Sequence, residues 1–219
     1  MRIDGTQIGL SYKSQGVRAA TVLFDVDIRM GDTGIYAVTG PSGCGKSSLL
    51  YVLSGLKAPT SGTVFYDDVD IQSYTANELA HLRRSSFGFI FQRPSLLESL
   101  SALDNVLILP SKNQKTIRER AMDLLVRLDM DRFCGKKPHV LSQGQRQRVA
   151  VARALVSDPA FLFADEPTAA LDRKSTDAVM CLIKEQSKRA SVLLISHDPF
   201  VLEQADKVFY MRDGRIETA

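Results

Sequence analysis

The sequence predicts an α/β protein built on a parallel β-sheet, because short apolar runs typical of strands alternate with longer stretches of helical periodicity. The apolar runs at 35–39, 160–164 and 192–195 are separated by such stretches, and strands that are joined through helices pair in parallel. Two further β-type runs, at 21–28 and 63–66, lie in the first third of the chain. We therefore expect a β-rich N-terminal part beside a parallel-sheet core.

Four stretches carry helical patterns. One begins at Lys46 and ends near Gly55, where glycine and then proline stop it. In 115–130 the apolar residues share one face, which indicates a packed amphipathic helix. The members of that face are Ile117, Ala121, Leu124, Leu125 and Leu128. The others follow Leu141 and span 173–188.

The helical patterns between about 75 and 157 interrupt the α/β core. A chain of 219 residues is long enough for one substantial core with a smaller lobe. We expect a single domain over 1–219, in which about 1–92 and 158–219 form the core with its β subdomain. Residues of about 93–157 would then form a helical subdomain.

Composition excludes several classes of function. The 28 Lys and Arg nearly balance the 25 Asp and Glu, leaving a net charge of +3, so no general nucleic-acid binding is expected. Three cysteines far apart argue for a reducing compartment and against a disulfide framework or a zinc site. The N-terminus lacks the apolar core of a signal peptide, and no run approaches the ~18 to 20 apolar residues of a membrane span. We expect a protein that is soluble by itself and able to dock on a membrane partner.

A phosphate-binding loop is predicted directly after the run at 35–39. The spacing G-x-x-x-x-G-K-[ST] is met at every fixed position. Its glycines let backbone N–H groups face phosphates, and the helix that follows adds its positive end. Lysine would reach the β- and γ-phosphates and the following serine would ligate Mg²⁺; the alternative is a glycine-rich turn that matches by chance. The expected ATP-binding residues here are Gly40, Pro41, Ser42, Gly43, Cys44, Gly45, Lys46, Ser47 and Ser48.

Two acids follow the apolar run at 160–164. Asp165, at a strand end, suits Mg²⁺ coordination beside the phosphates. Glu166 is placed to orient or deprotonate an attacking water. An acidic turn at a strand end is the simpler interpretation of either residue alone.

A third motif identifies a family by resemblance. Leu141 to Gln145, followed by a run from Arg146 to Ala154, resembles the signature segment of ABC-type ATPases, usually Leu-Ser-Gly-Gly-Gln. Further positions then match in order along essentially the whole chain. Gln92 resembles the Q-loop glutamine, Asp172 the D-loop aspartate, His197 the switch histidine and Tyr12 the aromatic residue that stacks on adenine.

The resemblance implies a fold and a mechanism. The fold would be that of an ABC ATPase, with a P-loop core, an antiparallel β subdomain and a helical insert. Two copies would enclose two ATP·Mg²⁺ head to tail, with the signature residues Ser142, Gln143, Gly144 and Gln145 acting in trans. Lys46, Gln92, Glu166 and His197 would be catalytic, and Ser47, Gln92 and Asp165 would hold Mg²⁺.

Within that superfamily, motifs such as 88–92 and 164–168 resemble the lipoprotein-release, macrolide-export and cell-division group. This implies an ATPase that powers a separately encoded integral membrane permease from the cytoplasmic face of a bacterial inner membrane. A soluble ABC ATPase of DNA repair or translation is the alternative. It would need a coiled-coil insertion, zinc modules or two cassettes, and a P-loop kinase would leave the signature unexplained.

Two departures and one surface complete the expectations. Gln143 replaces the first glycine of the signature pair, and Ala169-Ala170 stands where the group usually has Gly-Asn, so we expect a differently shaped D-loop. Four leucines after Gln92 could line a groove for a helix of the membrane partner, although burial within the insert explains at least half of them. They are Leu96, Leu97, Leu100 and Leu103.

Overall fold

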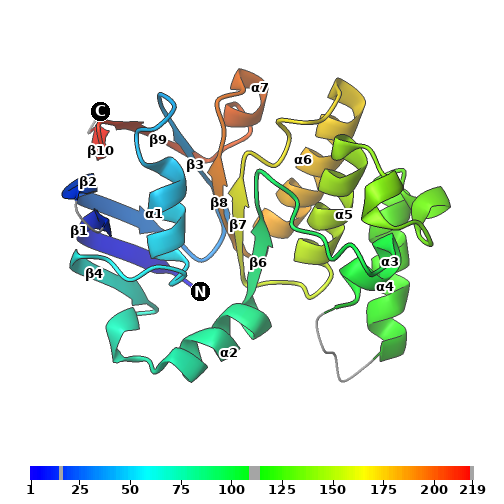
Figure 1. Cartoon of the computed structure of the whole chain (residues 1–219), viewed down its shortest axis with the longest axis horizontal. Coiled ribbons are helices and arrows are strands. Elements are labelled where there is room, and N and C mark those ends of the chain that lie inside the picture. The colour runs from blue at the N-terminus through cyan, green and yellow to red at the C-terminus, as the bar shows by residue number, and fades with distance from the viewer. Residues whose placement is uncertain (15–16, 109–113, 218–219) are drawn as a thin grey trace.

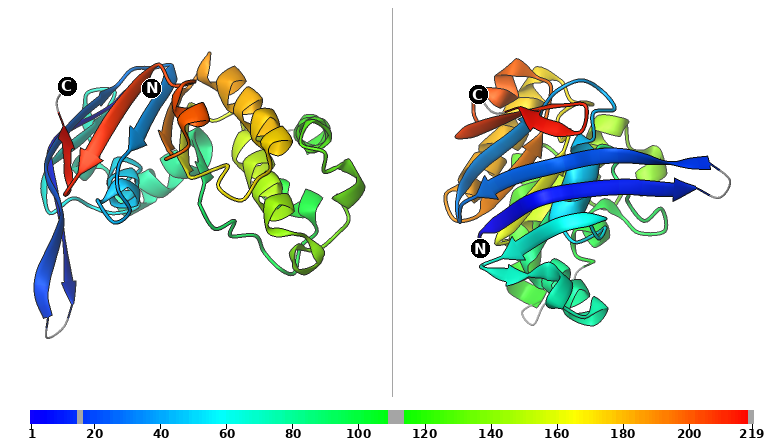
Figure 2. Two further views of the ribbon diagram at one scale, coloured as in Figure 1. Left: turned by 90° about the horizontal axis from the view of Figure 1, so that it is seen from above. Right: turned by 90° about the vertical axis from the view of Figure 1, so that its left-hand side faces the viewer.

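The computed structural model describes residues 1–14, 17–108 and 114–217, which form two sheets. The smaller sheet has strand order β2-β1-β4-β5 and is antiparallel. Its strands are β1 (Ile3–Ser14), β2 (Val17–Met30), β4 (Ser61–Tyr66) and β5 (Val69–Asp70). The paired strands β1 and β2 are the longest of the molecule and project beyond their neighbours (Figure 2).

The larger sheet has six strands in the order β10-β9-β3-β8-β7-β6. Its members are β3 (Gly34–Thr39), β6 (Phe87–Ile90), β7 (Phe161–Asp165), β8 (Ser191–Ile195), β9 (Lys207–Arg212) and β10 (Arg215–Glu217). All pairs from β9 to β6 are parallel, and β10 is antiparallel to β9. The carboxyl ends of β3, β7 and β8 therefore meet at one edge.

Helices cover both faces of this sheet, with α1 on one side and α5 and α6 on the other (Figure 1). The helices are α1 (Lys46–Leu53), α2 (Ala76–Ser86), α3 (Ala102–Val106), α4 (Gln114–Arg127), α5 (Gln143–Leu155), α6 (Arg173–Ser187) and α7 (Pro199–Leu202). Short 3₁₀ helices occupy Ile71–Ser73, Asp131–Phe133 and Pro138–Val140. Helices α3 and α4 lie farther from the sheet, against α5 (Figure 1).

Strand β7 shows why the two faces need two cores. Its alternate residues Leu162 and Ala164 belong to the apolar cluster under α5 and α6. Phe161 and Phe163 belong to the cluster under α1 and the antiparallel sheet. Successive side chains of a strand point to opposite faces, so a strand covered on both faces has a continuous apolar sequence.

The predicted α/β class and the mixture of a parallel sheet, an antiparallel β subdomain and helices are confirmed. The predicted helices at 115–130 and 173–188 are α4 and α6 within a few residues at each end. The hairpin of β9 and β10 was not expected. Its first strand alternates between exposed and buried residues and carries a charge at either end, so no continuous apolar run marks it.

Candidate active site

The loop between β3 and α1 has the backbone of a phosphate site. Gly45 precedes the first helical residue at φ 107°, so no side chain caps the first turn of α1. The N–H groups of that turn are therefore available to an anion. Lys46 donates hydrogen bonds of 2.8 Å to the carbonyl oxygens of Gly40 and Pro41, which holds its ammonium over the loop.

The C-terminal hairpin supports this loop from below. A Cβ on Gly40, at φ 144°, would lie 1.9 Å from the carbonyl oxygen of Met211 in β9. The N–H of Gly214 donates to the carbonyl of Cys44 at 3.1 Å, and the N–H of Phe24 donates to the carbonyl of Gly214 at 2.9 Å. Cys44 is buried between the loop and this hairpin, whereas Ser42 and Gly43 face solvent.

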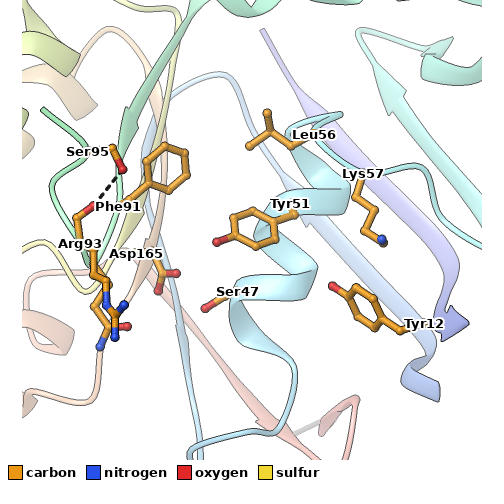
Figure 3. Close-up of a pocket in the computed structure, with 10 residues that line it drawn as sticks. Tyr12, Ser47, Tyr51, Leu56, Lys57, Phe91, Arg93, Ser95 and Asp165 are labelled. Carbon is orange, nitrogen blue, oxygen red and sulfur yellow. Dashed lines mark hydrogen bonds between the residues drawn. The ribbon is translucent and has the colours of Figure 1, made fainter. Parts of the chain in front are cut away.

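A cavity of about 690 Å³ opens beside the loop, and Figure 3 shows its lining. The lining residues are Tyr12, Ser47, Tyr51, Leu56, Lys57, Phe91, Gln92, Arg93, Ser95 and Asp165. Three predicted metal ligands, Ser47, Gln92 and Asp165, thus share one cavity, and we call their side of it the metal edge. Burial raises the pKa of Asp165, and the neighbouring Ser47 hydroxyl and Lys46 ammonium only partly oppose this.

Tyr12 stands at the rim of the same cavity. Its hydroxyl lies 3.3 Å from the hydroxyl of Ser48, and the residue is 37% exposed. The ammonium of Lys57 lies 4.3 Å from the ring centroid, close enough for a cation–π contact. The predicted base-stacking residue is therefore anchored to α1 and keeps ring surface open to solvent.

Glu166 and His197, which are far apart in sequence, meet at the ends of the adjacent strands β7 and β8. Glu166 adopts φ 48°, a left-handed conformation that is uncommon for a side chain of this size. Its N–H donates to the carbonyl of Ile195 at 3.0 Å. Its Oε1 lies 2.8 Å from Nδ1 of His197, whose side chain is 72% exposed while that of Glu166 is 10% exposed. The carboxylate is thus buried and oriented, and the imidazole beside it faces solvent.

The signature residues lie elsewhere. Ser142 caps α5: its hydroxyl accepts from the N–H of Gln145 at 3.2 Å, and its own N–H donates to Oε1 of Gln145 at 2.9 Å. Ser142 and Gln143 are exposed at the start of α5, which lies across the sheet from α1 (Figure 1). The structure of one chain therefore does not bring the signature to its own phosphate loop.

The D-loop lies between β7 and α6 and approaches the signature. Asp172 caps α6 through a 2.8 Å hydrogen bond from the N–H of Ser175, and that bond lowers the pKa of its carboxyl. Neither Ala169 nor Ala170 has a positive φ. A Cβ on Gly144 would lie 3.0 Å from the carbonyl oxygen of Ala170, so glycine permits the close approach of the signature to this loop.

The four leucines after Gln92 divide by burial. Leu103 is 9% exposed, and Leu96 packs against the core cluster under α5. Leu97 is 47% exposed, and Leu100 is intermediate. Burial thus accounts for part of the run, and Leu97 offers the most apolar surface to solvent.

Several residues near the site were not expected from the sequence, among them Tyr51, Lys57 and Gln147. Tyr51 and Lys57 line the cavity without belonging to any motif. Gln147 is 1% exposed and donates from Nε2 to the carbonyl oxygen of Phe91 at 3.2 Å. A polar residue one helical turn before the buried Val151 is a periodicity signal that could have drawn attention to it.

This arrangement defines a P-loop nucleotide-binding protein: an uncapped helix start, a lysine over the loop and a buried carboxylate beside it. Residues 23–169 match the family model described as ABC transporter. The chain is 39% identical over 213 residues to an uncharacterised ABC transporter ATP-binding protein, YvrO of Bacillus subtilis, covering 95% of this chain and 93% of that protein. The chain belongs to the ABC transporter family, as an ATP-binding subunit and ATPase.

Longer relatives match as well. The chain is 42% identical to the macrolide export ATP-binding/permease protein MacB 1/2 of Paracoccus denitrificans over 95% of its own length, and spans 32% of that protein. Among solved structures, it superposes with a TM-score of 0.91 on the ATP-binding cassette MJ0796, a dimer bound to ADP and Pi. That match has 32% identity and covers 99% of this chain and 97% of the other. None of the helices in 1–14, 17–108 and 114–217 is both long and apolar enough to cross a membrane.

The residues present fit the substrate ATP and the cofactor Mg²⁺. The start of α1 suits phosphate oxygens, and Ser47, Gln92 and Asp165 supply the hydroxyl, amide and carboxylate oxygens that Mg²⁺ prefers. Bound Mg²⁺ would neutralise charge that develops on the phosphates. A divalent cation at the metal edge would also balance the buried charge of Asp165, whose pKa is raised without one.

Proposed function

We propose that this chain hydrolyses ATP as a head-to-tail dimer in which each signature closes on the phosphate loop of the other copy. The observation that carries the proposal is the separation of Ser142 from Lys46 across the sheet. Both residues lie on surfaces that a second copy could reach, so each chain offers two half-sites. Ser142 and Gly144 would meet the γ-phosphate through a hydroxyl and a backbone N–H.

The residues of one half-site have distinct roles in this proposal. Lys46 and the loop N–H groups bind and neutralise the phosphates. Glu166 takes the proton of the attacking water, and the 2.8 Å contact with His197 holds the carboxylate in place. Gln92, Ser47 and Asp165 hold the metal, and the ring of Tyr12 stacks on the adenine base of ATP.

The work done by hydrolysis would be transport or mechanical work across a membrane. We place the chain on the cytoplasmic face of a bacterial inner membrane, bound to a permease on a separate chain. Support for a permease partner comes from the relatives named ATP-binding/permease proteins, and support for a separate chain comes from YvrO, an ATP-binding protein of which this chain covers 93%. The helical part at about 93–157 would move with respect to the core of 1–92 and 158–219 and carry the partner with it. Leu97 is the exposed apolar residue that would meet that partner.

Glu166→Gln tests the catalytic proposal. The variant keeps the side-chain volume but removes the base, so we expect it to bind ATP·Mg²⁺, to lose hydrolysis by roughly 100-fold or more, and to form a stable dimer. Phosphate release measures hydrolysis, and size-exclusion chromatography with light scattering measures dimer formation. Hydrolysis at the wild-type rate would rule out Glu166 as the base, and a monomer at saturating ATP would rule out the sandwich.

The same trapped dimer tests for the membrane partner. Purified from detergent-solubilised membranes, it is expected to retain an integral membrane protein on a separate chain. Leu97→Asp should lose that protein and keep ATP binding, because a charge on the exposed surface of Leu97 opposes apolar docking. Equal retention of the membrane protein with and without Leu97→Asp would count against a docking role for Leu97.

A further inference from the structure

Phe91, the residue before Gln92, is held from two directions. Its ring stacks on Phe89 with centroids 5.6 Å apart and planes at 12°, and Phe89 stacks on Phe163 at 5.4 Å and 13°. The ring of Tyr51 packs on the other end of this stack, 6.4 Å from Phe91 at 58°. Tyr51 belongs to α1, one helical turn after Ser47, so the nucleotide helix contacts the ring of Phe91.

The backbone of Phe91 is bonded to α5, on the other face of the sheet from α1. Gln147 of the signature helix α5 donates to the Phe91 carbonyl at 3.2 Å. Gln147 itself is 1% exposed, so its amide is fixed inside the fold where it makes this hydrogen bond. A shift of α5 therefore pulls on Phe91 directly.

The segment after Gln92 is bonded to the helical part of the chain. In the described residues, every side-chain hydrogen bond from this segment to another element goes to that part. Arg153 of α5 donates to the carbonyl of Ser95 at 2.6 Å. Asn105 of α3, which is fully buried, accepts from the N–H of Leu97 at 2.8 Å and donates to its carbonyl at 3.1 Å. Gln92 thus lies at the junction between a strand fixed to the core and a loop fixed to α3 and α5.

We propose that Tyr51 and Gln147 are positioning residues for ATP hydrolysis, which together hold Phe91 and thereby place Gln92 at the metal edge. The inference rests on the proposed role of Gln92 as a metal ligand. In Figure 3, Tyr51 extends between Phe91 and the side of the cavity where Ser47 and Asp165 lie, so its ring spans from the metal edge to the Q-loop. Gln147 holds the backbone of Phe91 from α5, the helix that begins at the signature.

Metal binding gives a test that does not depend on turnover. In the Glu166→Gln background with ATP bound, Tyr51→Leu and Gln147→Met should each raise the Mn²⁺ concentration for half-saturation about 10-fold, as expected when a group that orients a metal ligand is lost. Electron paramagnetic resonance of free Mn²⁺ measures the titration. ATP affinity without metal is measured for each variant, because Tyr51 lines the same cavity, and the 10-fold change is the change in Mn²⁺ half-saturation at saturating ATP.

Matched variants separate positioning from general stability. Tyr51→Phe keeps the ring and should keep the metal affinity of the parent. Gln186→Met also removes a buried glutamine that donates to a carbonyl, that of Pro159 at 2.8 Å. Because the Gln186 amide oxygen also accepts from Arg189 at 2.9 Å, this variant should lose at least as much stability as Gln147→Met and leave Mn²⁺ binding unchanged. Tyr51→Phe as defective as Tyr51→Leu, or Gln186→Met as defective in metal binding as Gln147→Met, would overturn the inference.

The double variant tests whether Tyr51 and Gln147 act through the same residue. If both residues act through Phe91, Tyr51→Leu combined with Gln147→Met should weaken Mn²⁺ binding by less than the product of the single effects. An effect equal to the product would show independent action and overturn the inference. Failure of the proposed function is a separate result, because it would appear as hydrolysis by Glu166→Gln. Loss of hydrolysis in that variant, with Mn²⁺ bound normally by the Tyr51 and Gln147 variants, would remove only this inference.

Discussion

Glycines of the phosphate loop serve different purposes at neighbouring positions. Gly40 is confined by the Met211 carbonyl, whereas nothing lies within 4 Å of a Cβ on Gly43, although both have positive φ. The motif predicts that glycine is needed but not which contact requires it, because Met211 is far away in sequence. Lys46 and Ser47 were predictable for the opposite reason, since their chemistry depends only on local spacing.

Gly40→Ala and Gly43→Ala should therefore differ. At Gly43 we expect only the cost of a left-handed alanine, about 1 kcal/mol, with ATP binding reduced modestly. At Gly40 the added methyl group must displace the backbone of β9, so we expect a loss of roughly 3 kcal/mol or more in the free energy of unfolding. Urea denaturation compares the two; equal losses would contradict the role assigned to Met211.

Secondary-structure elements differed in how far the sequence predicted them. Strands β3, β7 and β8 were predictable because both faces are covered and their apolar runs are continuous. The start of α5 carried a signature motif, yet its capping box of Ser142 and Gln145 was not expected. The contact of Glu166 with His197 needed the sheet order, which sequence spacing does not contain.

The capping box means that Ser142 has a structural duty besides the one proposed at phosphate. Ser142→Ala should lower the free energy of unfolding by about 1 kcal/mol through loss of the cap. Ser142→Asp keeps a capping oxygen and a favourable charge at the helix start, so its stability should stay near wild type. Both should lose hydrolysis, by roughly 100-fold. Thermal denaturation and phosphate release separate the two effects, and wild-type hydrolysis by Ser142→Asp would argue against contact with the γ-phosphate.

For the molecule as a whole, the helical part and the core are joined by an ion-pair cluster on Asp158. Arg120 of α4 donates to its Oδ1 at 3.0 Å, and Arg189 beyond α6 donates to the same atom at 2.7 Å. Partial burial alone would raise the pKa of Asp158, but the two arginine hydrogen bonds outweigh it and the pKa is lowered. Asp158 has φ 55°, a conformation that asparagine also adopts readily.

Asp158→Asn should thus remove the charge and keep the backbone. A lowered pKa in the folded state means stability that is present above the ordinary value of about 4 and lost as pH falls through the folded-state pKa. At pH 7 we expect a loss of about 0.5–1 kcal/mol, limited because the side chain is 43% exposed. Urea denaturation from pH 7 down to 3 should show the difference shrinking. Asp177→Asn, which loses one exposed pair with Arg173, is the control and should change less.

The support of the phosphate loop by β9 and β10 has a consequence for the synthesis of the protein on the ribosome. The loop is made early in the chain, but the carbonyl under Gly40 and the N–H that meets Cys44 come from residues 211 and 214. A ribosome releases the motif long before it releases that support. The nascent chain should therefore hold its nucleotide motif without a rigid nucleotide site until the hairpin of β9 and β10 emerges, so premature binding of ATP to a half-made subunit is avoided.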